Sequence, residues 1–151
     1  MGQQQLLLVI LVTIIVGIAT VVAINTFGTA ADQANVDAVR QDMLQIAASA
    51  QQYYMRPEML GGGGRSFDGI TFNDFAFAGT VEDVDEPANA FNENGRYHIS
   101  VTSDDSFTLV GHPASLIDGA VDEDSDASET MELTVERDSV TWVRSNPGST
   151  D

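Results

Sequence analysis

One loop near the C-terminus is dense in carboxylates, which are potential ligands for a hard cation. Asp122, Asp124 and Asp126 alternate in the way that the first three ligands of a calcium-binding loop do. The rest of that pattern is missing, since Ala127 stands where a glycine is needed and Leu133 where a bidentate glutamate is needed. Two interpretations stay open: a calcium site at these three aspartates, or a solvated acidic loop.

The other residue types that do chemistry form no recognisable constellation. His98 alternates with apolar neighbours and is expected to face solvent, and His112 is expected in a loop before Pro113. Their spacing does not require them to converge on a metal. Cysteine is absent and no serine lies in a nucleophile-elbow pattern, and the carboxylates are too numerous for one acid–base pair to stand out. The sequence therefore predicts no enzyme, and no cofactor apart from the calcium considered above.

Four consecutive glycines, Gly61 to Gly64, are the one stretch that could cradle a phosphate. No Lys-Ser/Thr pair follows them and no strand is expected before them, as a phosphate-binding loop would require. We therefore expect a plain, flexible connection. Trp142 and Tyr53 are expected to pack in the core or at an interface.

The charge balance restricts the partners of the chain. Among 151 residues, 23 are acidic and only six are basic, all of them arginine, which gives a net charge of −17. Every charged side chain follows Ala31. Such a surface repels phosphate backbones, so no direct nucleic-acid binding is expected. An acidic, lysine-free surface suits a halophilic protein in concentrated salt, and a calcium-rich or cationic partner is the alternative interpretation.

The N-terminal stretch from Leu6 to Ile24 is apolar and uncharged. As a helix it would be roughly 28 Å long, close to the thickness of the hydrocarbon core of a bilayer. This length predicts a transmembrane helix. A cleaved secretory signal, cut near Ala31, is the alternative, but it would have a basic start and a shorter apolar stretch.

The helical pattern continues beyond the apolar stretch. Apolar residues recur at alternating intervals of three and four, which predicts a single stripe along a helix that docks on the rest of the chain: Val36, Val39, Met43, Ile46, Ala50 and Tyr53. The helix is expected to end at Arg56, because the residue before a proline avoids the α region.

The remainder of the chain reads as short strands. Two hairpins are expected, one from Arg96–Thr102 and Phe107–Val110 and one from Met131–Val135 and Val140–Val143, and Ile70–Phe77 is expected to be partly strand. The predicted fold class is α+β. A long N-terminal α-helix, apolar in its first half and amphipathic in its second half, packs on a small antiparallel β-sheet of about four strands.

The start of the chain, Gly2-Gln3-Gln4-Gln5 followed by the apolar stretch, resembles the class III signal peptide of type IV pilins and pseudopilins. The resemblance implies that a prepilin peptidase cuts between Gly2 and Gln3 and that the new amino terminus is methylated. The chain is divergent within that family. Met1 stands where a basic residue is usual, and Leu7 replaces the usual glutamate at the fifth mature position. These differences fit an archaeal-like pilin or a minor pseudopilin.

The resemblance also implies an organisation and a function. Residues 1–2 would be a short leader, 3–28 a transmembrane and filament-core helix, 29–56 an amphipathic helix half, and 57–151 a β-rich acidic head with a linker at 57–69. The precursor would lie in the inner membrane, meet the peptidase and the pilus assembly machinery, and polymerise with copies of itself into an extracellular cell-surface filament. A minor pseudopilin of a type II secretion-like system and a monomeric membrane-anchored envelope binding module are the alternatives. The expected filament-core residues are Leu6, Leu7, Leu8, Val9, Ile10, Leu11, Val12, Ile14, Ile15, Val16, Gly17, Ile18, Val21, Val22 and Ile24.

Overall fold

The computed structural model describes residues 2–74, 76–82, 88–116 and 129–147. It divides into two compact units, Met1–Ala34 and Asn35–Asp151, which are treated separately below. Helix α1 (Gly2–Met55) belongs to both units, and a 3₁₀ turn, η1 (Glu58–Leu60), follows it. The strands are β1 (Thr80–Val81), β2 (Asn89–Phe91), β3 (Gly95–Ser103), β4 (Ser106–Pro113), β5 (Met131–Glu136) and β6 (Val140–Arg144).

The six strands form one antiparallel sheet in the order β1-β2-β3-β4-β5-β6, so each strand pairs with its neighbour in sequence. The α+β prediction is confirmed, and β3 to β6 are the four expected strands. The sheet is larger than expected because β1 and β2 extend its edge with two and three residues. The strand expected at 70–77 is wrong: its described residues form turns and irregular backbone, although Ile70 and Phe72 are buried in the core.

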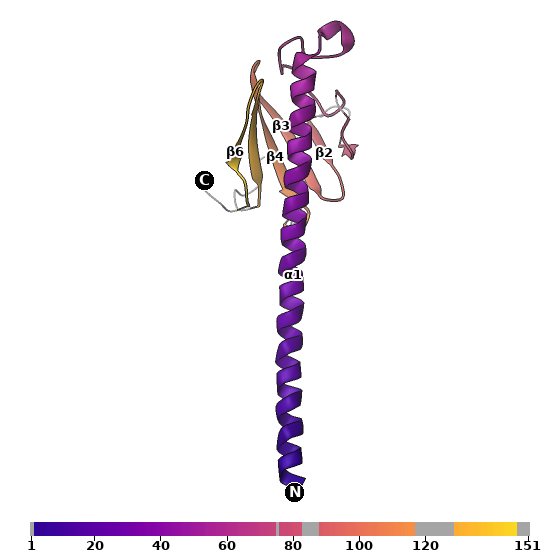
Figure 1. The fold of residues 1–151 in the computed structure, drawn as a ribbon. Coiled ribbons are helices and arrows are strands. Elements are labelled where there is room, and N and C mark those ends of the chain that lie inside the picture. The colour runs from indigo at the N-terminus through magenta and orange to yellow at the C-terminus, as the bar shows by residue number, and fades with distance from the viewer. Residues whose placement is uncertain (1, 75, 83–87, 117–128, 148–151) are drawn as a thin grey trace. The chain divides into compact units, whose positions relative to one another are not determined.

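The second half of α1 lies across one face of the sheet (Figure 1). Alternation along the strands points apolar side chains towards the helix, as the period of two requires. The central strands bury Tyr97, Ile99, Phe107, Leu109, Leu133 and Val135 in one cluster with the helix.

Gly111 in β4 lets the helix approach the sheet closely. A Cβ atom at this position would lie 2.6 Å from Sδ of Met43 and 3.1 Å from Cγ1 of Val39. Glycine is used where two backbones come together and a side chain would separate them. Gly111 is therefore a position of close approach between the helix and the sheet.

The four glycines after η1 fold back onto the end of α1 instead of extending away from it. The amides of Gly63 and Gly64 donate hydrogen bonds of 3.0 Å to the carbonyl oxygens of Tyr53 and Arg56. These bonds satisfy carbonyl groups that the end of a helix leaves unpaired. At Gly63 a Cβ atom would lie 1.9 Å from the carbonyl oxygen of Ser66, so the tight fold itself requires glycine.

Candidate functional site: the uncharged half of α1 and the helix–sheet contact

The first unit presents a continuous apolar surface. From Leu6 to Ile24 the large apolar side chains are 48% to 69% exposed. The helix is long and apolar enough to cross a membrane, and none of its most apolar stretch is buried inside the protein. A signal sequence has the same two properties. An apolar surface of this size on a folded protein marks contact with lipid or with another chain.

The hydroxyl groups in this half of the helix are satisfied by the helix itself. Thr13 donates to the carbonyl oxygens of Val9 and Ile10, at 3.0 and 2.8 Å. Thr20 and Thr26 donate to the carbonyls four residues earlier, at 2.8 and 2.9 Å. An unpaired hydroxyl in an apolar medium costs several kcal/mol. The hydroxyl groups of these threonines therefore need no partner outside the helix.

The glycines of the first unit have no packing role inside the chain. Gly2, in the first turn of α1, and Gly17 and Gly28 further along would each accept a Cβ atom that meets no other atom within 4 Å. Gln3, the expected new amino terminus, is exposed beside Gly2.

In the second unit, the helix stripe faces the sheet. Val39, Met43, Ile46, Ala50 and Tyr53 are buried, and Val36 is partly buried against the same cluster. Ala47 and Tyr54, which lie outside the stripe, are buried as well. Trp142 in β6 is partly buried against this core.

A half-buried polar network on Asp42 joins the helix to β3 and to the turn before it. Oδ2 of Asp42 accepts hydrogen bonds from Nδ2 of Asn92 and Nδ2 of Asn94, both 2.8 Å, and from the hydroxyl of Tyr97 at 2.7 Å. Burial raises the pKa of Asp42, but the three hydrogen bonds outweigh it, so the pKa is lowered. Burial, with the hydrogen bond to Asp42 second, raises the pKa of Tyr97. The apolar pattern gave no sign of this network, although Asp42 is the only charged residue between Arg40 and Arg56.

Further polar side chains of α1 bond to loops around the sheet. Nδ2 of Asn35 donates to the carbonyl of Asn94 at 2.9 Å, and its Oδ1 accepts from the amide of Ser115 at 3.0 Å. Arg40 pairs with Asp37 and donates to the carbonyl of Ser145 at 2.9 Å. Apart from the pair of Arg40 with Asp37, these partners lie too far apart in the chain for sequence spacing to predict them.

The hydrogen bonds continue towards the end of the helix. Nε2 of Gln51 donates to the carbonyl of Glu136 at 3.1 Å. The hydroxyl of Tyr54 donates to Oδ1 of Asp105 at 2.7 Å, and this bond is the main reason that the pKa of Tyr54 is raised. Polar contacts thus accompany the buried stripe along the second half of α1.

The two histidines lie closer together than the sequence indicated. His112 is not in a loop but in β4, where it pairs with Arg96, while His98 pairs with Val110. His112 is buried, and burial, followed by the charges of His98 and Arg96, lowers its pKa to about 4. Partly buried His98 contacts Oδ1 of Asn89 through Nδ1.

No metal site is apparent in the described part of the chain. Among those residues, no group of three or more histidine, aspartate or glutamate side chains could hold an ion. The expected calcium ligands Asp122, Asp124 and Asp126 lie outside the described residues.

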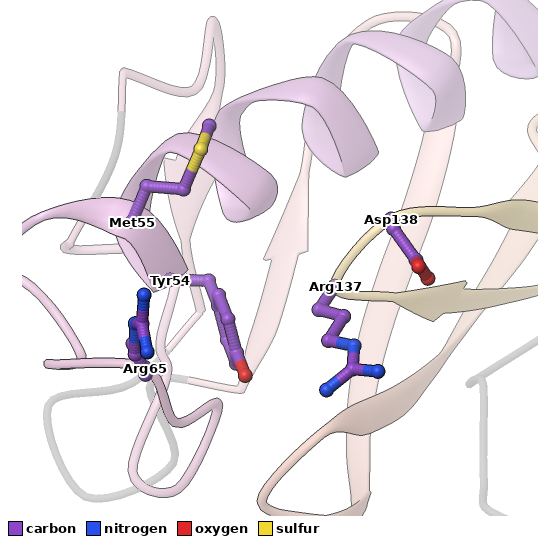
Figure 2. Close-up of a pocket in the computed structure, with 5 residues that line it drawn as sticks. All are labelled: Tyr54, Met55, Arg65, Arg137 and Asp138. Atoms are coloured by element: carbon purple, nitrogen blue, oxygen red, sulfur yellow. The ribbon is translucent and has the colours of Figure 1, made fainter.

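One open pocket lies at the far end of the helix–sheet contact, with a volume of about 390 Å³. Figure 2 shows Tyr54 between the guanidinium groups of Arg65 and Arg137, with Met55 and Asp138 completing the lining. Arg65 has a φ of 77°, the one positive value among the described non-glycine residues. Backbone in this region is unfavourable for a side-chain-bearing residue, so the fold of the loop holds Arg65 where it is.

Comparisons with protein-family models, curated proteins and solved structures found no match to this chain. The arrangement itself agrees with the architecture that the resemblance implied: a long N-terminal helix, apolar in its first half, whose second half packs on an antiparallel sheet.

Proposed function

We propose that this protein is a structural subunit of a type IV pilus-like filament. In this proposal a prepilin peptidase cuts it on the carboxyl side of Gly2, and it polymerises through Leu6 to Ile24. The precursor resides in the inner membrane, and the assembly machinery then moves it into an extracellular filament. The observation that carries the proposal is the exposed, uncharged helix half, which continues as a helix into a folded, acidic domain.

A filament core and a bilayer demand the same surface. Both are dry, so each polar group must be satisfied within the helix, as the hydroxyls of Thr13 and Thr20 are. Lipid tails and neighbouring leucines are about equally apolar, so transfer from one to the other needs little net free energy. Helices associate in such surroundings by close packing between their surfaces.

The glycines in the apolar half support contact with other helices. In a helix interior a glycine is less favourable than alanine by about 1 kcal/mol. Since nothing inside the chain lies near Gly17 or Gly28, the fold of this chain gives no reason for either residue. A neighbouring helix that approaches closely at these positions would give one.

The test compares the native chain with Gly2→Leu in the source cells. Sheared surface material is imaged by electron microscopy, and the N-terminal peptide is measured by mass spectrometry. The native chain is expected to form filaments whose main protein begins at Gln3, whereas Gly2→Leu is expected to stay uncut in the membrane. Ala48→Leu is the matched control, because it also adds a leucine at an exposed position of α1 but lies away from the cleavage position and outside the stretch from Leu6 to Ile24.

Filaments made from uncut Gly2→Leu chains would contradict the processing step. Native chains that remain as monomers in the membrane would contradict the whole proposal and favour a membrane-anchored binding module.

A further inference from the structure

An apolar surface is exposed on the second unit as well, where α1 ends. Met55, Met59 and Leu60 lie within a stretch of six residues and are 70%, 97% and 71% exposed. We call this surface, with the arginines around it, the Met59 patch: Met55, Arg56, Met59, Leu60, Arg65 and Arg137.

The loop that carries the patch is held in place by backbone bonds. The amide of Leu60 donates to the carbonyl of Pro57 at 2.9 Å, and the amide of Arg65 donates to the carbonyl of Tyr54 at 2.9 Å. Gly62 packs against Arg56, where a Cβ atom would lie 2.2 Å from the carbonyl oxygen. Met59 and Leu60 are therefore presented to solvent by a bonded loop, and a partner would meet a surface that is already ordered.

The charge of the patch differs from that of the chain. It holds three of the six arginines, against 23 acidic residues in the whole chain. Neither Arg65 nor Arg137 forms an ion pair with a carboxylate among the described residues. Three carboxylates also lie at this end of the helix: Glu58 in η1, Asp138 in the pocket, and Asp105, which accepts the hydroxyl of Tyr54. With three arginines against three carboxylates, this region is close to neutral, whereas the chain as a whole is strongly acidic.

We propose that the Met59 patch docks on the acidic head of a second copy of this chain. Two molecules that each carry a charge of −17 repel one another over most of their surfaces, and the repulsion is weakest where one of them is apolar and basic. The apolar side chains would lose their exposure to water, and the guanidinium groups of Arg65 and Arg137 would bond to carboxylates of the other copy. This inference rests on the proposed function, in which copies lie beside one another.

The absence of cysteine allows a direct test in the full-length chain. Met59→Cys is labelled with a benzophenone maleimide, irradiated in cells, and the adduct is identified by mass spectrometry in both the membrane and the sheared-filament fractions. Glu93→Cys, in the turn between β2 and β3, is the matched control, since it is exposed but outside the patch. We expect a covalent dimer of this chain from position 59, with the second copy labelled in its head, and none from position 93.

The arginines are tested separately. Combined Arg65→Gln and Arg137→Gln substitutions on the Met59→Cys chain should lower the yield of dimer several-fold, and the same substitutions to lysine should retain most of it. A dimer in the membrane fraction without filaments would support the patch and contradict the filament. Filaments without a dimer from position 59, or a cross-link to lipid or to another protein alone, would overturn the patch proposal and leave the filament proposal intact.

Discussion

The hydroxyl of Tyr97 in β3 donates a 2.7 Å hydrogen bond to Oδ2 of Asp42 in α1. Tyr97 is 1% exposed, so the bond lies in surroundings where an unpaired group is costly. The same oxygen also accepts hydrogen bonds from the side-chain amides of Asn92 and Asn94. One carboxylate thus joins the helix to β3 and to the turn that precedes it.

Asp42→Ala should lower the free energy of unfolding of the second unit by about 2–3 kcal/mol, because the buried hydroxyl of Tyr97 and two half-buried amides lose a charged acceptor. The measurement is urea denaturation of the full chain in detergent, followed by the fluorescence of Trp142, the single tryptophan. Asp37→Ala is the control. It removes an exposed pair with Arg40, which should cost less than about 1 kcal/mol. Equal losses in the two variants would contradict the role of Asp42.

Stability should fall as the pH decreases from about 6.5 to 4 because of His112. Its pKa is about 4 in the folded chain against 6.5 for the ordinary group, so in this range the unfolded chain binds the additional proton. This part of the free energy of unfolding is on the order of 1–3 kcal/mol. It is present in full above about pH 6.5 and is lost below about pH 4. His112→Gln should remove this part of the pH dependence. If stability falls by the same amount between pH 6.5 and pH 4 in the native and substituted chains, His112 is not the cause.

Met43→Ala and Leu44→Ala form a matched pair of neighbours, one on the face of the helix that meets the sheet and one on its exposed side. Met43 is 0% exposed and Leu44 is 44% exposed. Removing the buried side chain should cost about 2–5 kcal/mol, and removing the exposed one about 1 kcal/mol or less. Urea midpoints of the two variants provide the comparison, and a larger loss from Leu44→Ala would contradict the docking of this face on the sheet.

Gly63→Ala should open the loop after η1, since the new Cβ atom would lie 1.9 Å from a backbone oxygen that cannot easily move. Gly61→Asn is the control because Gly61 has a φ of 73° and open space around it, and asparagine tolerates that backbone region. Limited proteolysis should cut the loop faster in Gly63→Ala than in the native chain or the control. Equal rates in all three would show that the glycines serve only as a connection.

Ile15→Arg should weaken retention of the chain in the membrane. A charged residue at the centre of a spanning helix costs about 2.5–3.5 kcal/mol on insertion scales. Fractionation of cells before any filament forms measures the effect, and Ile15→Leu should behave as the native chain does. Retention of Ile15→Arg at the native level would contradict a membrane-spanning role for Leu6 to Ile24.

The parts of the fold that could be predicted are those in which apolar residues recur at a regular interval. The long helix repeats every three to four residues, and its end follows from Arg56 standing before a proline. Strands β3 to β6 alternate clearly, and short turns join β3 to β4 and β5 to β6. By contrast, β1 and β2 have two and three residues, which is too short for any alternation to appear.

Other features could not be predicted because they depend on the tertiary fold. Ile70 and Phe72 fill the core from a segment of turns. Its apolar composition resembles that of a strand, which is why a strand was expected there. Asp42 finds its donors about fifty residues away, and no local pattern identifies such partners. The apolar first half of α1 could be predicted because an uncharged apolar stretch needs no tertiary contact to be recognised.

The polar contacts along the second half of α1 have a mechanical consequence. Asn35 and Asp42 both bond to the turn between β2 and β3, whereas Arg40, Gln51 and Tyr54 bond to Ser145, Glu136 and Asp105 elsewhere around the sheet. Over these twenty residues the helix is about 30 Å long, so the bonds are spread along its axis. Tension applied along that axis would shear all of them at once instead of peeling them one after another, and the helix and sheet would resist extension as a single body.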